Sequence, residues 1–167
     1  MPDAWATGSS GATERRIAAR ADRTRPVVPS WITVSDAGLI TLRSGFSVAA
    51  TIDRLTGAVT SRGMTVFAMI DHAANAVEVG MELRPTQLLI FGNPRAGTLL
   101  MRDQQSVGLD LPLRTLVWED EAGDVWATYD DPHWLATRYA LGQTSGGAVD
   151  AMAAALSVVL AEATSGG

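Results

Sequence analysis

The most regular hydrophobic pattern in the chain lies between Ser47 and Gly63. Apolar residues recur there every three or four positions, which is the spacing of one buried face of an amphipathic helix. Ser47 is a good N-cap, and Gly63 stands where a left-handed residue commonly ends a helix. The buried face consists of Val48, Ile52, Leu55 and Val59. The pattern therefore predicts one helix of about four turns, packed against the rest of the domain.

Apolar segments of strand length occur on both sides of this helix. Alternating apolar and polar residues predict a first strand pair, and nearly continuous apolar runs predict buried strands. The acidic segment 119–123 ends in a glycine and predicts the turn of an antiparallel hairpin. The predicted strands cover residues 31–34, 38–43, 64–70, 87–91, 111–118 and 124–129.

Shorter helices are predicted between and after these strands. One covers 74–81 and is stopped by Arg84-Pro85, and another runs from an N-cap at Thr98 to about Gln105. Asp131 and Pro132 begin a third, which ends near Tyr139. A loose segment at 142–147 then precedes an amphipathic terminal helix from Val149 to Leu160.

The ends of the chain differ from its middle in composition. Residues 1–26 are rich in Ala, Gly, Ser, Thr and Arg and show little apolar periodicity, so we expect a flexible N-terminal extension. The length and pattern of the remainder predict a single domain at 27–163 and a flexible tail at 164–167.

Two residue types are missing, and their absence excludes several chemistries. The chain contains no cysteine, which removes disulfides, thiolate metal sites and cysteine nucleophiles. It also contains no lysine, so a Schiff base of the kind pyridoxal-phosphate enzymes use cannot form. All thirteen cations are arginines, which stay protonated at any working pH and cannot act as general bases.

The net charge of −5 also bears on partners. Residues 31–167 carry eight arginines against fifteen acidic residues, and such a surface would repel a phosphate backbone, so we expect no binding to nucleic acid. No uninterrupted apolar run reaches the length of a membrane span, and the first thirty residues lack the apolar stretch of a secretory signal. We therefore expect a cytoplasmic protein with no membrane partner.

Asp71 and His72 are the candidate catalytic residues. They follow the buried run 64–70, and the end of a strand is a common place for functional side chains. Histidine is the side chain whose unperturbed pKa lies closest to neutrality, which suits proton transfer. The structural alternative is that Asp71 caps the next helix and His72 is a hydrogen-bonded structural residue. The sequence leaves both readings open.

The segment 92–98 is the candidate ligand-binding loop. It joins a buried strand to a predicted helix N-terminus, where free amide groups can hold an anion. Arg95 lies inside it, and Arg84 precedes the same strand, so the two could grip a carboxylate or phosphate. The candidate ligand-binding residues are Arg84, Asn93, Arg95, Gly97 and Thr98. A turn that needs Gly and Pro for its backbone shape is the alternative.

The histidines offer little for metal or cofactor binding. His72 and His133 are the two in the sequence, too few for a three-histidine zinc site in one chain. His133 follows a turn and is more typical of a solvent-facing position. A haem held by His72 remains a formal option that no haem motif supports. The sequence therefore indicates no particular cofactor or metal.

The central segments resemble a known family. They are 67–74, with Phe-Ala-Met-Ile-Asp-His-Ala-Ala, 83–94, with Leu-Arg-Pro-Thr-Gln-Leu-Leu-Ile-Phe-Gly-Asn-Pro, the triplet 96–98, the segment 109–114 and the hairpin 119–129. In this order they resemble the domain of unknown function 302 family. The resemblance implies a TATA-binding-protein-like α+β fold, with a curved antiparallel sheet packed on a long helix, and a homodimer. A C-terminal helix is added here, and no activity is implied.

Three functions remain open at this level. The first is a small-molecule-binding protein, because an apolar core with a few convergent polar groups and no recognisable nucleophile suits binding. The second is a cofactor-independent lyase, isomerase or cyclase, with His72 or Asp71 moving a proton and Arg84 or Arg95 holding an anionic group. The third is an interaction module that uses the terminal helix or the hairpin edge.

Overall fold

A computed structural model describes residues 32–35 and 37–166 and shows an α+β domain built on one antiparallel sheet. The sheet has six strands in the order β1-β2-β6-β5-β4-β3. The strands are β1 (Ile32–Val34), β2 (Leu39–Ser44), β3 (Thr65–Asp71), β4 (Thr86–Gly92), β5 (Leu113–Glu119) and β6 (Val125–Asp130). The helices are α1 (Val48–Ser61), α2 (His72–Glu78), α3 (Pro94–Asp103), the 3-10 helix η1 (Gln105–Leu109), α4 (Pro132–Arg138) and α5 (Gln143–Thr164).

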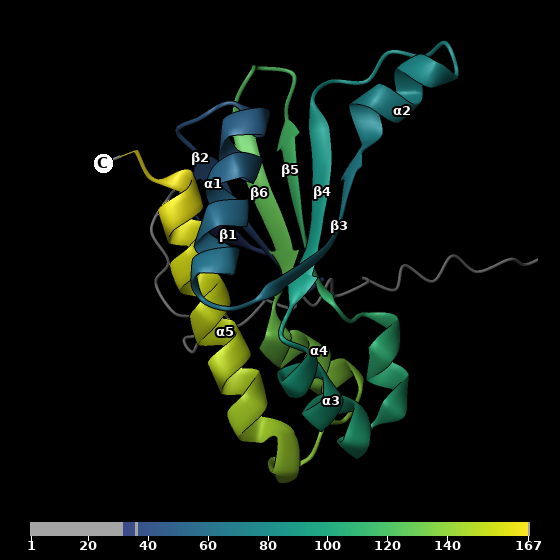
Figure 1. Cartoon of the computed structure of the whole chain (residues 1–167), viewed down its shortest axis with the longest axis vertical. Helices are drawn as coiled ribbons and strands as arrows, with labels where there is room; N and C mark the ends of the chain where they lie inside the picture. Colours follow the sequence, from purple (N-terminus) through teal and green to yellow (C-terminus); the bar gives the residue numbers. More distant parts are fainter. Residues whose placement is uncertain (1–31, 36, 167) are drawn as a thin grey trace, which may run out of the picture.

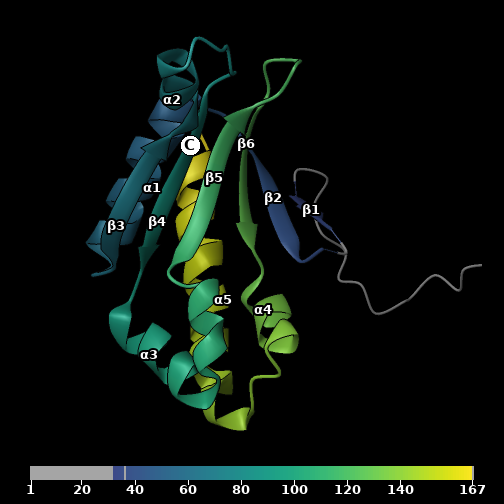
Figure 2. The same ribbon diagram turned by 90° about the vertical axis from the view of Figure 1, so that its right-hand side faces the viewer.

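The two long helices cover one face of the sheet. Figures 1 and 2 show α1 and α5 side by side on this face, with α2 beyond one end of the strands and α3 and α4 beyond the other. Alternate residues of the central strands point at the helices: Val117 of β5 pairs with Ala127 of β6, and both are fully buried. The predicted antiparallel sheet packed on a long helix, with a C-terminal helix, is confirmed.

The helix α1 forms as its sequence predicts. The Ser47 hydroxyl accepts a hydrogen bond from the Ala50 N–H at 3.3 Å, and Gly63 adopts a φ of +70° just after the helix. The whole predicted apolar stripe is buried. Capping residues and apolar periodicity were sufficient to predict this helix, because the groups that define it lie within one short stretch of the chain.

The boundaries of two shorter helices differ from the prediction. α3 begins at Pro94 and not at Thr98, because the side chain of Asn93 accepts from the backbone N–H groups of Arg95 and Ala96 and proline suits the first turn. The Thr98 hydroxyl instead donates to the Pro94 carbonyl inside the helix, at 2.8 Å. α2 begins at His72, two residues earlier than expected, because Asp71 is its N-cap.

The start of α5 also differs from the prediction. The segment 142–147, expected to be loose, is the N-cap and first turns of a 22-residue helix. Asp103, at the end of α3, accepts from the Gly142 N–H at 2.7 Å and from the Ser145 hydroxyl at 2.6 Å. A carboxylate distant in sequence therefore serves as the cap that the local residues lack, and Ser145 is buried.

By length and mean hydropathy, α5 is long and apolar enough to cross a membrane. Its apolar residues do not form one uninterrupted run, because Asp150, Ser157 and Glu162 lie among them. In this fold α5 packs on α1, and Val149, Leu156 and Leu160 belong to the core. These contacts bury one side of α5 against α1 and the core.

The described residues include the predicted C-terminal limit of the domain, residue 163. α5 ends at Thr164, which is buried, one residue past the expected limit. Arg54 donates to the carbonyls of Glu162, Ala163 and Ser165, so the end of α5 is tied to α1. The expected N-terminal extension, 1–26, lies outside the described residues.

Candidate functional site

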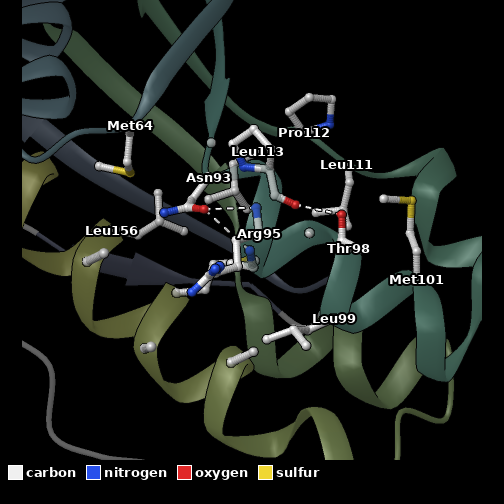
Figure 3. A pocket seen from close by; sticks show the side chains of 18 of the residues that line it. Met64, Asn93, Arg95, Thr98, Leu99, Met101, Leu111, Pro112, Leu113 and Leu156 are labelled. Carbon is white, nitrogen blue, oxygen red and sulfur yellow. Dashed lines mark hydrogen bonds between the residues drawn. The ribbon is translucent and has the colours of Figure 1, made fainter.

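A pocket of about 590 Å³ lies at the end of the sheet where β4 leads into α3. Its walls come from α3, from the middle of α5, and from the residues that precede and begin β5 (Figure 3). This size falls within the range of small-molecule sites in proteins. The apolar lining includes Met64, Phe67, Leu99, Met101, Leu111, Pro112, Leu113, Met152 and Leu156.

The wall from α5 is concave because its side chains are small. Ala148, Ala151 and Ala155 recur at helical spacing and line the pocket. Met152 and Leu156, on the same side of the helix, are buried. A helix face with methyl groups in place of longer side chains leaves space between α5 and α3, although both helices stay in contact.

The opposite wall is set by the first turn of α3. Asn93 fixes this turn through its bonds to the backbone N–H groups of Arg95 and Ala96, at 2.9 and 3.4 Å. Gly97 lies in the same turn, and a Cβ built on it would be 3.8 Å from Leu111, at ordinary contact distance. The backbone of α3 therefore lies close to the segment before β5.

The pocket has a positive character in an acidic protein. Two arginines, Arg62 and Arg95, line it, and no aspartate or glutamate is among its described lining residues. Arg62 pairs with Glu162 at 2.7 Å and donates to the Ala58 carbonyl at 3.0 Å. The guanidinium of Arg95 is exposed and has no ion pair or hydrogen bond within the described part of the chain.

The structure brings four of the five predicted ligand-binding residues to this pocket. Asn93, Arg95, Gly97 and Thr98 all line it, and Figure 3 shows the hydrogen bonds of the Asn93 and Thr98 side chains with the α3 backbone. The side chains of Asn93 and Thr98 already bond to the helix backbone, so Arg95 is the member with free hydrogen-bonding capacity. Arg84 is not part of the pocket.

Asp71 and His72 lie at the other end of the sheet. Asp71 pairs with Gln87 across β3 and β4, while Gly92, the residue of β4 that lines the pocket, is five residues further along. At the rise of an extended strand this separation is roughly 17 Å, and Phe67, the residue of β3 that lines the pocket, is four residues or roughly 13 Å from Asp71. Neither candidate catalytic residue lines the pocket.

The carboxylate of Asp71 has structural partners. It accepts from the Ala74 N–H and from the Gln87 side-chain amide, each at 2.9 Å. The Ala74 bond, followed by that of Gln87, lowers the pKa of Asp71 below its usual value. A carboxylate held in its charged form by two donors is a helix cap and a weak proton acceptor.

Arg84 is fixed beside the β5–β6 hairpin. Its Nε donates to the Glu119 carbonyl at 3.1 Å, and its Nη1 lies 3.9 Å from a carboxylate oxygen of Glu121. The hairpin turn itself is organised by Asp120, whose pKa is lowered first by the indole N–H of Trp126. Arg84 thus belongs to the end of the sheet away from Arg95.

His133 lies in the first turn of α4, and its Nδ1 is 3.8 Å from the exposed carboxylate of Asp150. Among residues 32–35 and 37–166, no group of three His, Asp or Glu side chains is arranged to hold a metal ion.

The α5 wall and the methionines of the pocket have only weak signals in the sequence. Methionines such as Met64 and Met101 suit the packing of a core as well as the wall of an adaptable apolar pocket. The spacing of Ala148, Ala151 and Ala155 was the available signal, but small residues at helical spacing equally suit close helix packing. Which neighbour they face is decided by the fold.

Comparisons with known proteins agree with this architecture. A crystal structure of an uncharacterized conserved protein DUF302 from Bacillus stearothermophilus superposes with a TM-score of 0.67, over 75% of this chain and 98% of that one. The two sequences are 18% identical, so this likeness concerns the fold.

Two similar sequences come from Brucella. A protein of Brucella suis biovar 1 (strain 1330) named fluoride-specific ion channel FluC 1 is 51% identical over 124 residues, which is 74% of this chain and 49% of that protein. A protein of Brucella melitensis biotype 1 named fluoride-specific ion channel FluC 2 matches equally over 46% of its length. The chain thus spans about half the length of these curated relatives.

The family model described as Domain of unknown function DUF302 matches residues 40–163, from β2 to the last turn of α5. This range includes the pocket, four complete strands, and all but one residue of β2 and of α5. The chain therefore belongs to the DUF302 family.

Proposed function

We propose that this domain binds a small molecule with an apolar body in the pocket between α3 and α5. The observation that carries the proposal is a cavity of about 590 Å³ whose lining is mostly aliphatic, aromatic and thioether side chains. Such concave apolar sites with few polar groups are typical of small-molecule recognition.

Exposed apolar surface at the pocket supports the proposal. Phe67 and Leu99 line it, and they are 49% and 46% exposed. Burial of apolar surface contributes roughly 25 cal/mol per Å², so an apolar ligand that covers such side chains gains affinity without a large rearrangement. Met64 and Met101 add flexible side chains that adapt to different ligand shapes.

Blocking the pocket tests the proposal. Ala151→Trp places an indole in the cavity, and Ala154→Trp, on the exposed side of the same helix and not in the lining, is the matched control. We expect the protein and the control to bind a neutral solvatochromic dye such as Nile red, and Ala151→Trp to lose that binding. Equal dye binding by all three folded proteins would contradict the assignment.

The alternative of a cofactor-independent enzyme finds less support. It requires His72 or Asp71 to act together with Arg84 or Arg95 on one substrate. Asp71 is a helix cap, and roughly 17 Å of strand separates it from the pocket end of β4. A homodimer and a cytoplasmic location remain expectations of this proposal, and size-exclusion chromatography with light scattering tests the first.

The Brucella relatives favour one physiological setting. Because this chain is 51% identical to about half of proteins named fluoride-specific ion channels, we propose that the domain works alongside a fluoride-specific ion channel in its host. Deleting its coding sequence should lower fluoride tolerance but not chloride tolerance. Unchanged growth across a fluoride series would remove this setting and leave the pocket proposal intact.

A further inference from the structure

The charges around the pocket narrow the chemistry of its ligand, an inference that rests on the proposed binding function. The described part of the chain has more acidic residues than arginines, yet the pocket lining has two arginines and no described carboxylate. Arg62 is paired with Glu162 beside the pocket, so the positive charge of the lining that has no counter-charge among the described residues is that of Arg95. The site is therefore a local exception to the charge of the domain. An anion that most of the surface would repel meets an attractive potential there.

A census of the arginines singles out Arg95. Six of the eight arginines in the described residues have a carboxylate or carbonyl partner. The two whose guanidinium groups have no hydrogen-bond or ion-pair partner among the described residues are Arg95 and Arg102, both on α3. Arg102 is in the last turn, where a cation is favourable beside the helix C-terminus, and it does not line the pocket.

The position of Arg95 suits recognition of a charged head group. The Asn93 cap orders the turn that carries it, and Thr98, one turn along, bonds back to the helix. In Figure 3, Arg95 lies between the α3 wall and Leu156 of α5. A guanidinium offers a planar pair of donors that matches a carboxylate, and such charged hydrogen bonds are stronger than neutral ones.

We propose that the pocket binds a carboxylate amphiphile of the fatty-acid type, with the carboxylate paired to Arg95 and the hydrocarbon body among the side chains of α3 and α5. The head group satisfies the unpaired cation, and the chain covers the exposed apolar lining. A neutral apolar molecule would leave the guanidinium without a partner. The N-terminal segment of the chain itself suits the site poorly, because residues 1–30 carry five arginines against three acids.

Matched ligands and variants test the proposal on the full chain. Binding of dodecanoate and of dodecanol, both below their aggregation concentrations, is measured by isothermal titration calorimetry at neutral pH. We expect the intact protein to prefer dodecanoate by about tenfold or more, as a charge-assisted hydrogen bond would give. Arg95→Gln should remove the preference while dodecanol binding stays unchanged, and Arg95→Lys should restore part of it. Arg102→Gln, on the same helix, is the control and should behave like the parent.

The outcomes separate this inference from the proposed function. Binding of neither ligand, with the fold intact by circular dichroism, would overturn both. Equal binding of the two ligands, unaffected by Arg95→Gln, would overturn the carboxylate assignment and keep the apolar pocket. Loss of the dodecanoate preference in Arg102→Gln to the same degree as in Arg95→Gln would show a general charge effect and also overturn the assignment.

Discussion

The two ends of the β3–β4 strand pair carry different kinds of chemistry. At one end lie Asp71, His72 and Arg84, three ionisable residues beside α2. At the other end lie Met64, Gly92 and the turn that carries Arg95, where the pocket opens. The sequence predicts a catalytic site at the first end, whereas the cavity lies at the second end.

The difference concerns free hydrogen-bonding capacity. The carboxylate of Asp71 and the guanidinium of Arg84 have protein partners that hold α2 and the hairpin in place. Arg95 has none among the described residues and lies beside apolar surface. In this domain, a side chain that the fold leaves without a hydrogen-bond partner therefore marks a binding site better than a residue type that is common in catalysis.

The largest contrast is expected in stability. Leu156 lines the inner side of the pocket and is 1% exposed, whereas Val77 on α2 is 70% exposed. Leu156→Ala should lower the free energy of unfolding by about 2–5 kcal/mol, because it leaves a cavity in the core. Val77→Ala should change it by less than about 0.5 kcal/mol. Urea denaturation of both variants measures the contrast, and a similar loss in both would show that α2 is buried in solution.

A moderate effect on ligand binding is expected from weakening the hydrogen bonds between α3 and α5. Asp103→Asn keeps the shape but weakens the cap that Gly142 and Ser145 share. We expect faster hydrogen exchange at the start of α5 and weaker ligand binding, because both helices form walls of the pocket. Asp71→Asn, which weakens the cap of α2, is the matched change at the other end and should leave binding intact. Weaker binding in both variants would mean that the two ends are coupled.

The same two carboxylates predict an acid sensitivity. The pKa of Asp103 is lowered first by the Ser145 hydroxyl and then by the Gly142 N–H, and that of Asp71 first by the Ala74 N–H. A lowered folded-state pKa stabilises the fold above the unfolded value, about 3.9, and that contribution is lost as the pH falls through the folded value. The Tm difference between the parent and each Asn variant should therefore shrink from pH 6 towards pH 3. A difference that grows on acidification would reverse the assigned sign.

The smallest effect is expected at His72. His72→Ala should leave ligand binding and its pH dependence unchanged, because the imidazole does not line the pocket. Parallel titrations of parent and variant between pH 5.5 and 8 measure this. A loss of affinity would indicate a second site at the α2 end and revive the acid–base hypothesis.

Several features of the fold were predictable from nearby residues. The α1 stripe, its Ser47 cap, the left-handed Gly63 and the strand pattern were all correct, because each depends on interactions within a few positions. The caps at Asn93 and Asp71 were equally local, and the first was misassigned to Thr98 because Asn93-Pro94 was read as a turn. The start of α5 was harder to predict from the sequence, because its cap is Asp103, nearly forty residues earlier.

The sequence by itself determined the elements, the family and the residue types available for chemistry. Helical and strand periodicity, caps and the absence of cysteine and lysine are properties of short stretches or of composition. The tertiary structure alone decided that Arg95 faces a pocket and that Asp71 and Arg84 do not. Antiparallel pairing places the start of β3 beside the end of β4, and α5 returns to form the second wall. A cavity and an unpaired charge arise from such long-range packing, which no local pattern records.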